Sequence, residues 1–221
     1  MRQFLLPGEN FVDVGANIGF ISISAAQVLG EGTIWAFEPN PEAREILEKN
    51  IALNKIRNIQ VLPYALGSSE GQGEIFINAI AHNRGGATLL DIEKRKDGKT
   101  YSVEIKRLDK LLPENFSLAM MKIDVEGFEM EVLKGAEIWL RKKDAPALIV
   151  ECSLERNTTN FSGVDLFNYI KGLNKYLIFK LAKGKNRLSK LQEIKNEKDL
   201  PRHDNIFCFL PEQLPRLHSM F

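Results

Sequence analysis

The sequence has few cysteines, no long apolar segment and almost no net charge. Cys152 and Cys208 are its only cysteines. Without metal-ligand spacing they are expected to be reduced, buried thiols, which suits the cytoplasm, and a disulfide between them is the alternative. No apolar run approaches the roughly 18 residues of a membrane span, so a soluble chain is expected. With 30 basic and 29 acidic residues the net charge is +1, which excludes a global field that attracts nucleic acid or an anionic membrane. The expected partner is a small molecule.

Strand and helix patterns alternate along most of the chain. Its 221 residues, 44% hydrophobic and 27% charged, suit one globular domain, 1–221. Strands are expected at about 10–14, 33–37, 59–66, 118–123, 147–150, 176–181 and 205–210, and helices at about 18–29, 41–54, 128–142 and 164–173. Between the two halves, residues 67–107 are rich in glycine and contain two extended segments, which predict an inserted pair of strands. The predicted fold class is therefore α/β, with a doubly wound sheet.

Four of the expected strands end in residues that suit a binding site. Gly15 follows the first strand, Glu38 the second, Asp124 the fourth and Glu151 the fifth. In open α/β sheets, ligands bind outside the carboxyl ends of the strands. A single acidic residue at a strand end is more often a helix cap or a solvated turn, but several at one edge favour a ligand site.

The first turn indicates the kind of cofactor. Gly15-Ala-Asn-Ile-Gly19 joins a strand to a helix, so N–H groups of the helix start face outward. Glu38 is placed like the acid that hydrogen-bonds a ribose. NAD fits poorly, because the dinucleotide motif has three glycines and this turn carries Asn17 in place of the second. The Asp13 carboxylate would also repel a pyrophosphate, whereas S-adenosylmethionine carries a sulfonium and fits better.

Several motifs together carry a family resemblance. They are Asp13–Gly19, Glu38–Asn40, Tyr64–Leu66, Lys122–Gly127 with Glu129, and Asp204–Phe207. In these motifs the sequence resembles the FkbM-type methyltransferases, a branch of the class I S-adenosylmethionine-dependent enzymes. The resemblance covers about residues 9–211, and Lys-Ile-Asp-Val-Glu-Gly is its most specific element.

The resemblance implies a Rossmann-like, mostly parallel seven-stranded sheet with an antiparallel last strand, a small inserted β-hairpin, and O-methylation of a hydroxyl. The acceptor is then a sugar or another small molecule. The low net charge and the lack of a long apolar run predict that neither a nucleic acid nor a membrane is a partner. The resemblance also implies that the first turn holds the methionine end of the cofactor, Glu38 the ribose, and the Tyr64 segment the adenine. Tyr64 departs from the Asp of many class I enzymes. The candidate cofactor-binding residues are Asp13, Gly15, Ala16, Asn17, Gly19, Glu38, Pro39, Tyr64, Ala65, Leu66 and Asp124.

An attacking alcohol must lose its proton, so a carboxylate or an imidazole is expected near the methyl group. The candidates are Asp124, Glu126, Glu151 and His203, the last in a polar loop. Glu126 has an alternative role, which is to complement the positive end of the helix that follows. No metal is expected: Asp124 and Glu151 supply oxygen ligands that suit Mg²⁺, but no third ligand is evident.

Two other functions compatible with the cofactor motifs are a non-catalytic S-adenosylmethionine-binding module and, with less support, an NAD-dependent oxidoreductase. Segments Asn83–Thr88 and 155–163 are expected to shape the acceptor pocket, because loops of this kind often meet the substrate.

Overall fold

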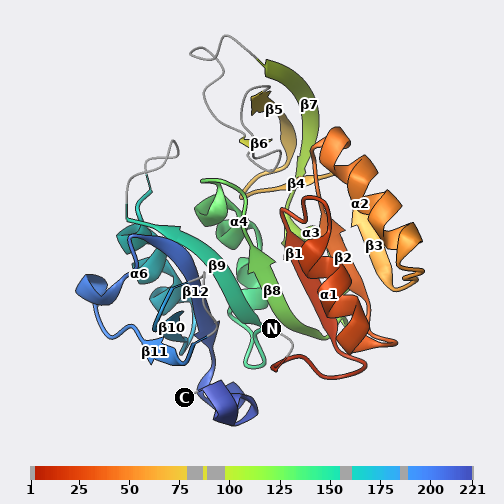
Figure 1. Cartoon of the computed structure of the whole chain (residues 1–221). Coiled ribbons are helices and arrows are strands. Elements are labelled where there is room, and N and C mark those ends of the chain that lie inside the picture. The colour runs from red at the N-terminus through yellow and green to blue at the C-terminus, as the bar shows by residue number, and fades with distance from the viewer. Residues whose placement is uncertain (1–2, 79–86, 89–97, 155–160, 185–188, 221) are drawn as a thin grey trace.

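The computed structural model describes residues 3–78, 87–88, 98–154, 161–184 and 189–220. Its main element is an eight-stranded sheet in the order β11-β10-β12-β9-β8-β1-β2-β3 (Figure 1). The strands are β1 (Asn10–Val14), β2 (Ile34–Phe37), β3 (Ile59–Leu62), β8 (Leu118–Ile123), β9 (Ala147–Ser153), β10 (Leu177–Leu181), β11 (Leu191–Glu193) and β12 (His203–Phe209). From β3 to β9 neighbouring strands are parallel, whereas β12 is antiparallel to both β9 and β10. The predicted fold class is confirmed, and β11 adds one strand to the seven that were expected.

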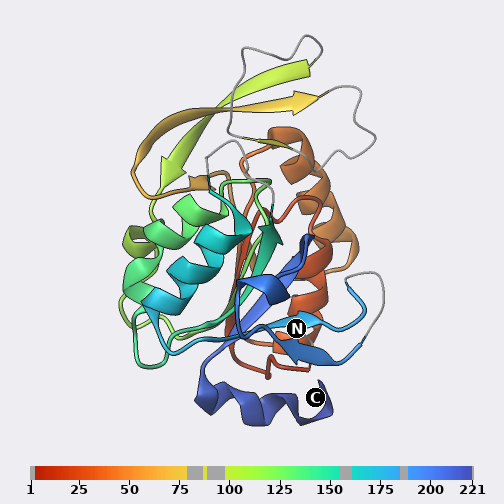
Figure 2. The same cartoon turned by 90° about the vertical axis from the view of Figure 1, so that its left-hand side faces the viewer.

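Helices cover both faces of the sheet (Figure 2). They are α1 (Phe20–Leu29), α2 (Pro41–Leu53), α3 (Leu108–Leu111), α4 (Glu129–Gly135), α5 (Glu137–Leu140) and α6 (Gly163–Leu173), followed by the 3₁₀ segments η2 (Glu197–Asp199) and η3 (Pro211–Met220). In Figure 2, α1 and α2 lie on one side of the sheet, and α4 and α6 on the other. Alternate side chains of β1 therefore enter different cores: Phe11 packs with Leu29 of α1, and Val12 with Leu133 of α4. Each of these side chains is fully buried.

Helix α2 begins where the sequence predicts. The Oδ1 atom of Asn40 accepts hydrogen bonds from the N–H groups of Glu42 (2.9 Å) and Ala43 (3.4 Å), and Pro41 takes the first helical position. A side-chain cap of this kind satisfies N–H groups that the first turn of a helix leaves without partners. The cap fixes the chain immediately after Glu38, at the carboxyl end of β2.

A second, smaller sheet lies at the end of the main sheet where β8 and β9 terminate (Figure 1). Its order is β4-β7-β5-β6, with β4 (Ala65–Leu66), β5 (Gly71–Asn78), β6 (Ala87–Thr88) and β7 (Gly98–Lys106). The antiparallel strands β5 and β7 are the predicted inserted pair. The expected third strand, 59–66, is not continuous, because Pro63 has no N–H for a ladder and the chain changes sheets there. Leu66 therefore belongs to the small sheet.

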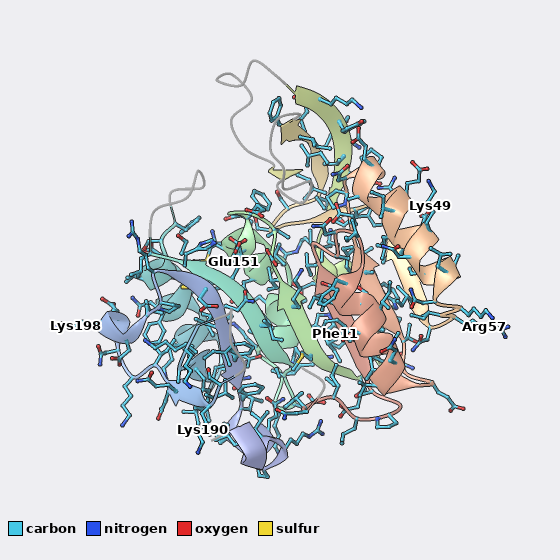
Figure 3. All side chains as sticks on the ribbon, in the orientation of Figure 1. Phe11, Lys49, Arg57, Glu151, Lys190 and Lys198 are labelled. Carbon is cyan, nitrogen blue, oxygen red and sulfur yellow. The ribbon has the colours of Figure 1, made fainter. Side chains whose placement is uncertain are left out.

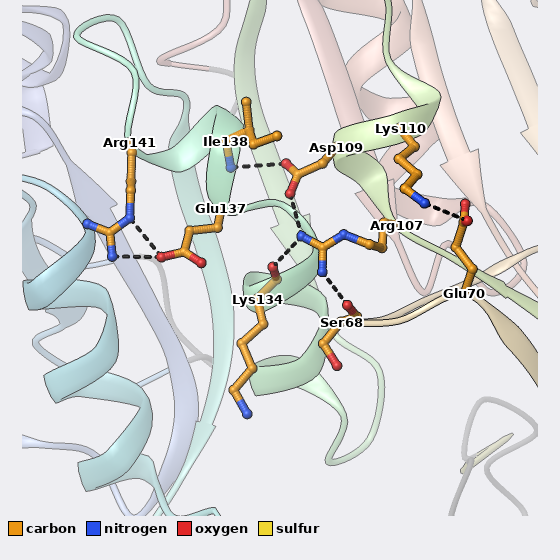
Figure 4. A network of polar contacts seen from close by, with 9 residues as sticks. All are labelled: Ser68, Glu70, Arg107, Asp109, Lys110, Lys134, Glu137, Ile138 and Arg141. Carbon is orange, nitrogen blue, oxygen red and sulfur yellow. Dashed lines mark hydrogen bonds and ion pairs between the residues drawn. The ribbon is translucent and has the colours of Figure 1, made fainter.

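The single helix predicted over 128–142 is wrong, because α4 and α5 are separated at Ala136 (φ −114°). In a continuous helix the N–H of Ile138 would donate to the carbonyl of Lys134. Instead, Ile138 N donates to Asp109 Oδ1 (3.0 Å), and the Lys134 carbonyl accepts from Arg107 Nη2 (3.2 Å) (Figure 4). Arg107 also donates to Asp109 (2.8 Å) and to the carbonyl of Ser68. This ion pair replaces a helical hydrogen bond and joins the small sheet to the helical layer.

Cys152 and Cys208 are buried and free, as expected. In the part of the chain that the structure describes, no helix is long and apolar enough to cross a membrane.

Candidate active site

The turn after β1 is shaped by three residues with positive φ: Gly15 (+75°), Asn17 (+50°) and Gly19 (+89°). The N–H groups of Gly15 and Ala16 both donate to the carbonyl of Phe37, at 3.0 Å each. A Cβ added to Gly15 would lie 1.9 Å from the backbone oxygen of Asp124. Position 15 therefore requires glycine, both for the positive φ and to avoid a collision with the backbone of Asp124. Helix α1 starts at Phe20, two residues later than the expected start at Ile18.

Glu38 joins this turn to the start of α2. Its Oε2 accepts from Asn17 N (2.7 Å) and its Oε1 from Asn40 N (2.8 Å), while the residue is only 6% exposed. Burial raises the pKa of Glu38 above its ordinary value, and the two N–H donors and Lys122 offset part of that rise. Each carboxylate oxygen has a second lone pair, so Glu38 can accept further hydrogen bonds.

Lys122, to which the sequence analysis gave no role, lies beneath the turn. Its Nζ donates to the carbonyl of Gly15 (2.7 Å) and lies 3.3 Å from Asp13 Oδ1 and 3.6 Å from Asp124 Oδ2. Burial lowers the pKa of Lys122, but the two carboxylates outweigh burial and raise this pKa, so the ammonium stays charged. The signal in the sequence was a single lysine in the apolar strand Leu-Ala-Met-Met-Lys-Ile.

Two of the predicted cofactor residues do not line the cleft that the other candidates form. Asp13 is fully buried, with its Oδ2 accepting from Ser22 Oγ (2.6 Å) and its Oδ1 facing Lys122. Gly19 packs against α2, because a Cβ there would lie 2.2 Å from the Leu47 side chain. Asp13 and Gly19 therefore contribute to the structure of the turn through buried contacts, outside the cleft lining.

The remaining predicted residues converge on one cleft of about 530 Å³, a size that suits a small-molecule ligand. Those that line it are Gly15, Ala16, Asn17, Glu38, Pro39, Tyr64, Ala65, Leu66, Asp124, Glu126, Glu151 and His203. The cleft also includes Phe37, Ile75 and Phe128, which the sequence analysis did not single out. Strand ends of the main sheet form one side of the cleft, and Leu66 and Ile75 bring in the small sheet. Figure 3 labels Glu151 at the end of β9 that faces this region.

A side cavity of about 210 Å³ adjoins the cleft and shares Glu126, Glu151 and His203 with it. Glu126 has a φ of +53°, in a turn held by Glu129, whose Oε1 accepts from Val125 N (3.1 Å) and Gly127 N (3.0 Å). Burial raises the pKa of Glu129 above its ordinary value. Glu129 thus fixes the turn, and Glu126 lies on the wall between the two spaces.

His203 was expected in a polar loop, but it is the first residue of β12. Its Nε2 lies 3.3 Å from Oε1 of Glu151, and the pair forms part of the same wall. In the antiparallel register His203 is opposite Ser153, and Asn205 is opposite Glu151. His203 and Glu151 are therefore diagonal neighbours on the same face of the sheet, within reach of each other. Of the segments expected to shape the acceptor pocket, 83–86 and 155–160 lie outside the described residues, while Ser162 and Gly163 line the side cavity.

Comparison with known families identifies the chain. The model of the methyltransferase FkbM domain matches residues 13–178. The chain belongs to the FkbM methyltransferase family. Methyltransferase sdnD of Sordaria araneosa is 33% identical to this FkbM domain, in an alignment covering 60% of this chain and 62% of that protein. The chain thus spans less than two thirds of this relative's length.

Solved structures share the fold of this FkbM domain. A putative rRNA methylase from Clostridium thermocellum has a TM-score of 0.54 at 10% identity, covering 94% of this chain and 88% of that chain. A putative methyltransferase from Streptococcus mutans, solved in complex with SAH, has a TM-score of 0.51 at 10% identity and covers 94% and 92%. At such low identity these likenesses establish a class I methyltransferase fold.

S-adenosylmethionine is the methyl donor that the family implies, and the residues of the cleft fit it. Glu38 presents carboxylate lone pairs for a diol, Phe37 and Leu66 supply apolar surface for a purine, and Asp124 supplies negative charge for an ammonium or a sulfonium. The Oδ1 atom of Asn17 is buried without a hydrogen-bond partner among the described residues, so the turn has an unused acceptor. Within the described ranges no group of three or more His, Cys, Asp or Glu residues is arranged to hold a metal.

Proposed function

We propose that this FkbM domain is an S-adenosylmethionine-dependent O-methyltransferase that acts on a hydroxyl of a sugar or another small molecule. The observation that carries the proposal is the wall shared by the cofactor cleft and the side cavity. Glu126, Glu151 and His203 face both spaces, so a hydroxyl that enters from the cavity reaches acid–base groups beside the cleft. The side cavity is therefore the proposed acceptor site.

The chemistry of the cavity supports a neutral hydroxyl acceptor. Its lining includes Glu126, Glu129 and Glu151, whose carboxylates accept hydrogen bonds and repel phosphate or carboxylate groups. Phe161 and Leu166 also line the cavity and supply apolar surface. This combination suits a ring that bears hydroxyl groups.

The pair of His203 and Glu151 supplies the base in this proposal. When His203 is neutral and donates from Nε2 to Glu151, its Nδ1 is free to accept the proton of the attacking hydroxyl. Glu151 orients the ring and stabilises the imidazolium that results. The bound cofactor supplies an electrophilic methyl group, and the protein contributes by holding the oxygen close to it, since correct positioning can lower a barrier by about 7–11 kcal/mol. Asp124 and Lys122 line the floor of the cleft on the cofactor side.

A methyl-release assay tests the proposal. The protein is incubated with methyl-labelled S-adenosylmethionine and a panel of glycosides and other alcohols, and transfer of label is measured. We expect turnover with one class of alcohol, and a loss of about 10²–10⁴-fold in His203→Gln because the base is removed. Cofactor affinity, measured by calorimetry, should change less than about twofold. Glu48→Gln, on the exposed surface of α2, is the matched control.

Two results would contradict the proposal. Tight binding of the cofactor with no transfer to any acceptor would indicate a binding module rather than an enzyme. Full turnover in His203→Gln would remove His203 and its partner from the reaction.

A further inference from the structure

The floor of the cofactor cleft contains three charged side chains in contact. Lys122 has a side-chain exposure of 10% and lies between Asp13, which is fully buried, and Asp124, which is 39% exposed. The Oδ1 atom of Asp13 has no hydrogen-bond partner among the described residues, so the ammonium 3.3 Å away is its counter-charge. Lys122 therefore balances one of two negative charges at the base of the site.

Lys122 also fixes the backbone of the first turn. It donates to the carbonyl of Gly15 at 2.7 Å. Gly15 is also the residue where an added Cβ would lie 1.9 Å from the backbone oxygen of Asp124. Neither effect requires Lys122 to react with anything. Its position is that of a group that sets the electrostatic potential and shape of the cleft.

We infer that Lys122 is a positioning residue that limits how strongly the cleft holds a sulfonium. This inference rests on the proposed function, in which the C–S bond breaks as a C–O bond forms, the sulfonium becomes a neutral thioether, and the hydroxyl proton passes to His203. Positive charge on sulfur disappears during the transfer. Two unbalanced carboxylates would stabilise the charged cofactor more than the transition state, which slows the reaction. Lys122 offsets that excess stabilisation.

Binding measurements with the cofactor and its demethylated product test this charge balance. Calorimetry gives the dissociation constants of S-adenosylmethionine and S-adenosylhomocysteine, and their ratio isolates the effect of charge on sulfur. Lys122→Met should shift the ratio toward S-adenosylmethionine by about three- to tenfold, because a positive charge is removed. Asp13→Asn should shift it by a similar factor in the opposite direction. The double variant Asp13→Asn/Lys122→Met restores the net charge, and its ratio should lie within about twofold of the wild type.

Lys110→Met is the control, since it removes the same charge from a residue that does not line the cleft. Its ratio should equal that of the wild type. If Lys122→Met fails to fold, Asp13→Asn and the double variant still test the inference, because the ratios of dissociation constants expected for these two variants differ. Parallel weakening of both ligands, or equal ratios in all folded variants, would overturn the inference and leave the proposed function in place. Absence of binding to the wild type would overturn both.

Discussion

Replacing Gly15 by alanine tests whether the first turn and the end of β8 must approach closely. Gly15 has a φ of +75°, and an added Cβ would lie 1.9 Å from the backbone oxygen of Asp124. Gly8 offers a matched control, because its φ is +85° and a Cβ there would meet nothing within 4 Å. The two substitutions share the backbone strain and differ in the collision.

The strain of a left-handed alanine costs about 1–2 kcal/mol, and both variants should lose this amount. Gly15→Ala must also displace the backbone of Asp124, and overpacking of this kind adds about 1–3 kcal/mol. In a protein of this length, each kcal/mol lowers the melting temperature by about 2–4 °C. Gly15→Ala should therefore melt about 2–12 °C below Gly8→Ala. It should also bind S-adenosylmethionine at least about tenfold more weakly, since both displaced residues line the cleft.

Thermal unfolding followed by circular dichroism gives the first quantity, and calorimetry on the folded variants gives the second. Equal melting temperatures for Gly8→Ala and Gly15→Ala would refute the close approach of the two backbones. Wild-type cofactor affinity in Gly15→Ala would refute the role of the turn in binding.

Three further outcomes follow from buried polar groups. Arg107→Met should lower the free energy of unfolding by about 2–3 kcal/mol, since it removes the ion-pair partner of the buried Asp109 carboxylate and a donor to the Lys134 carbonyl. Lys110→Met breaks an exposed pair and should cost less than about 1 kcal/mol in urea unfolding; equal losses would contradict the network. Burial raises the pKa of the Cys152 thiol to about 12 and also raises that of Cys208, so neither should react with a thiol reagent at about pH 8 until the protein unfolds. Burial raises the pKa of Glu129 above its ordinary value of 4.5. The stability that this shift contributes to the folded protein is therefore complete below pH 4.5 and is lost as the pH rises through the folded-state pKa. The free energy of unfolding of Glu129→Gln should thus increase relative to that of the wild type as the pH rises, and parallel curves for the two proteins would contradict this.

Local patterns in the sequence were sufficient to predict the elements that form the main cleft. The strand at Asn10–Val14, the cap at Asn40 and the acids Glu38, Asp124 and Glu151 all follow from nearby residues and from the rule that parallel strands end at a common edge. The cleft lining includes these three acids.

Other features depend on contacts between distant segments, which one sequence does not reveal. The helix break at Ala136 depends on Arg107 and Asp109, which no periodicity in that segment records. The contact of His203 with Glu151 depends on the register of an antiparallel strand formed late in the chain. Lys122 lies in a recognised motif, but its role depends on its contact with Asp13, which lies on another strand far away in the sequence.

The most direct test of the cofactor site is a calorimetric titration of S-adenosylmethionine into the wild type, Glu38→Ala and Glu45→Ala. Glu45 is an exposed residue of α2 and serves as the control. We expect micromolar binding to the wild type and to Glu45→Ala, and a loss of at least about tenfold in Glu38→Ala, because hydrogen bonds to a charged group contribute about 1.5–3 kcal/mol. Equal affinity in folded Glu38→Ala and the wild type would contradict the assignment of this cleft as the cofactor site.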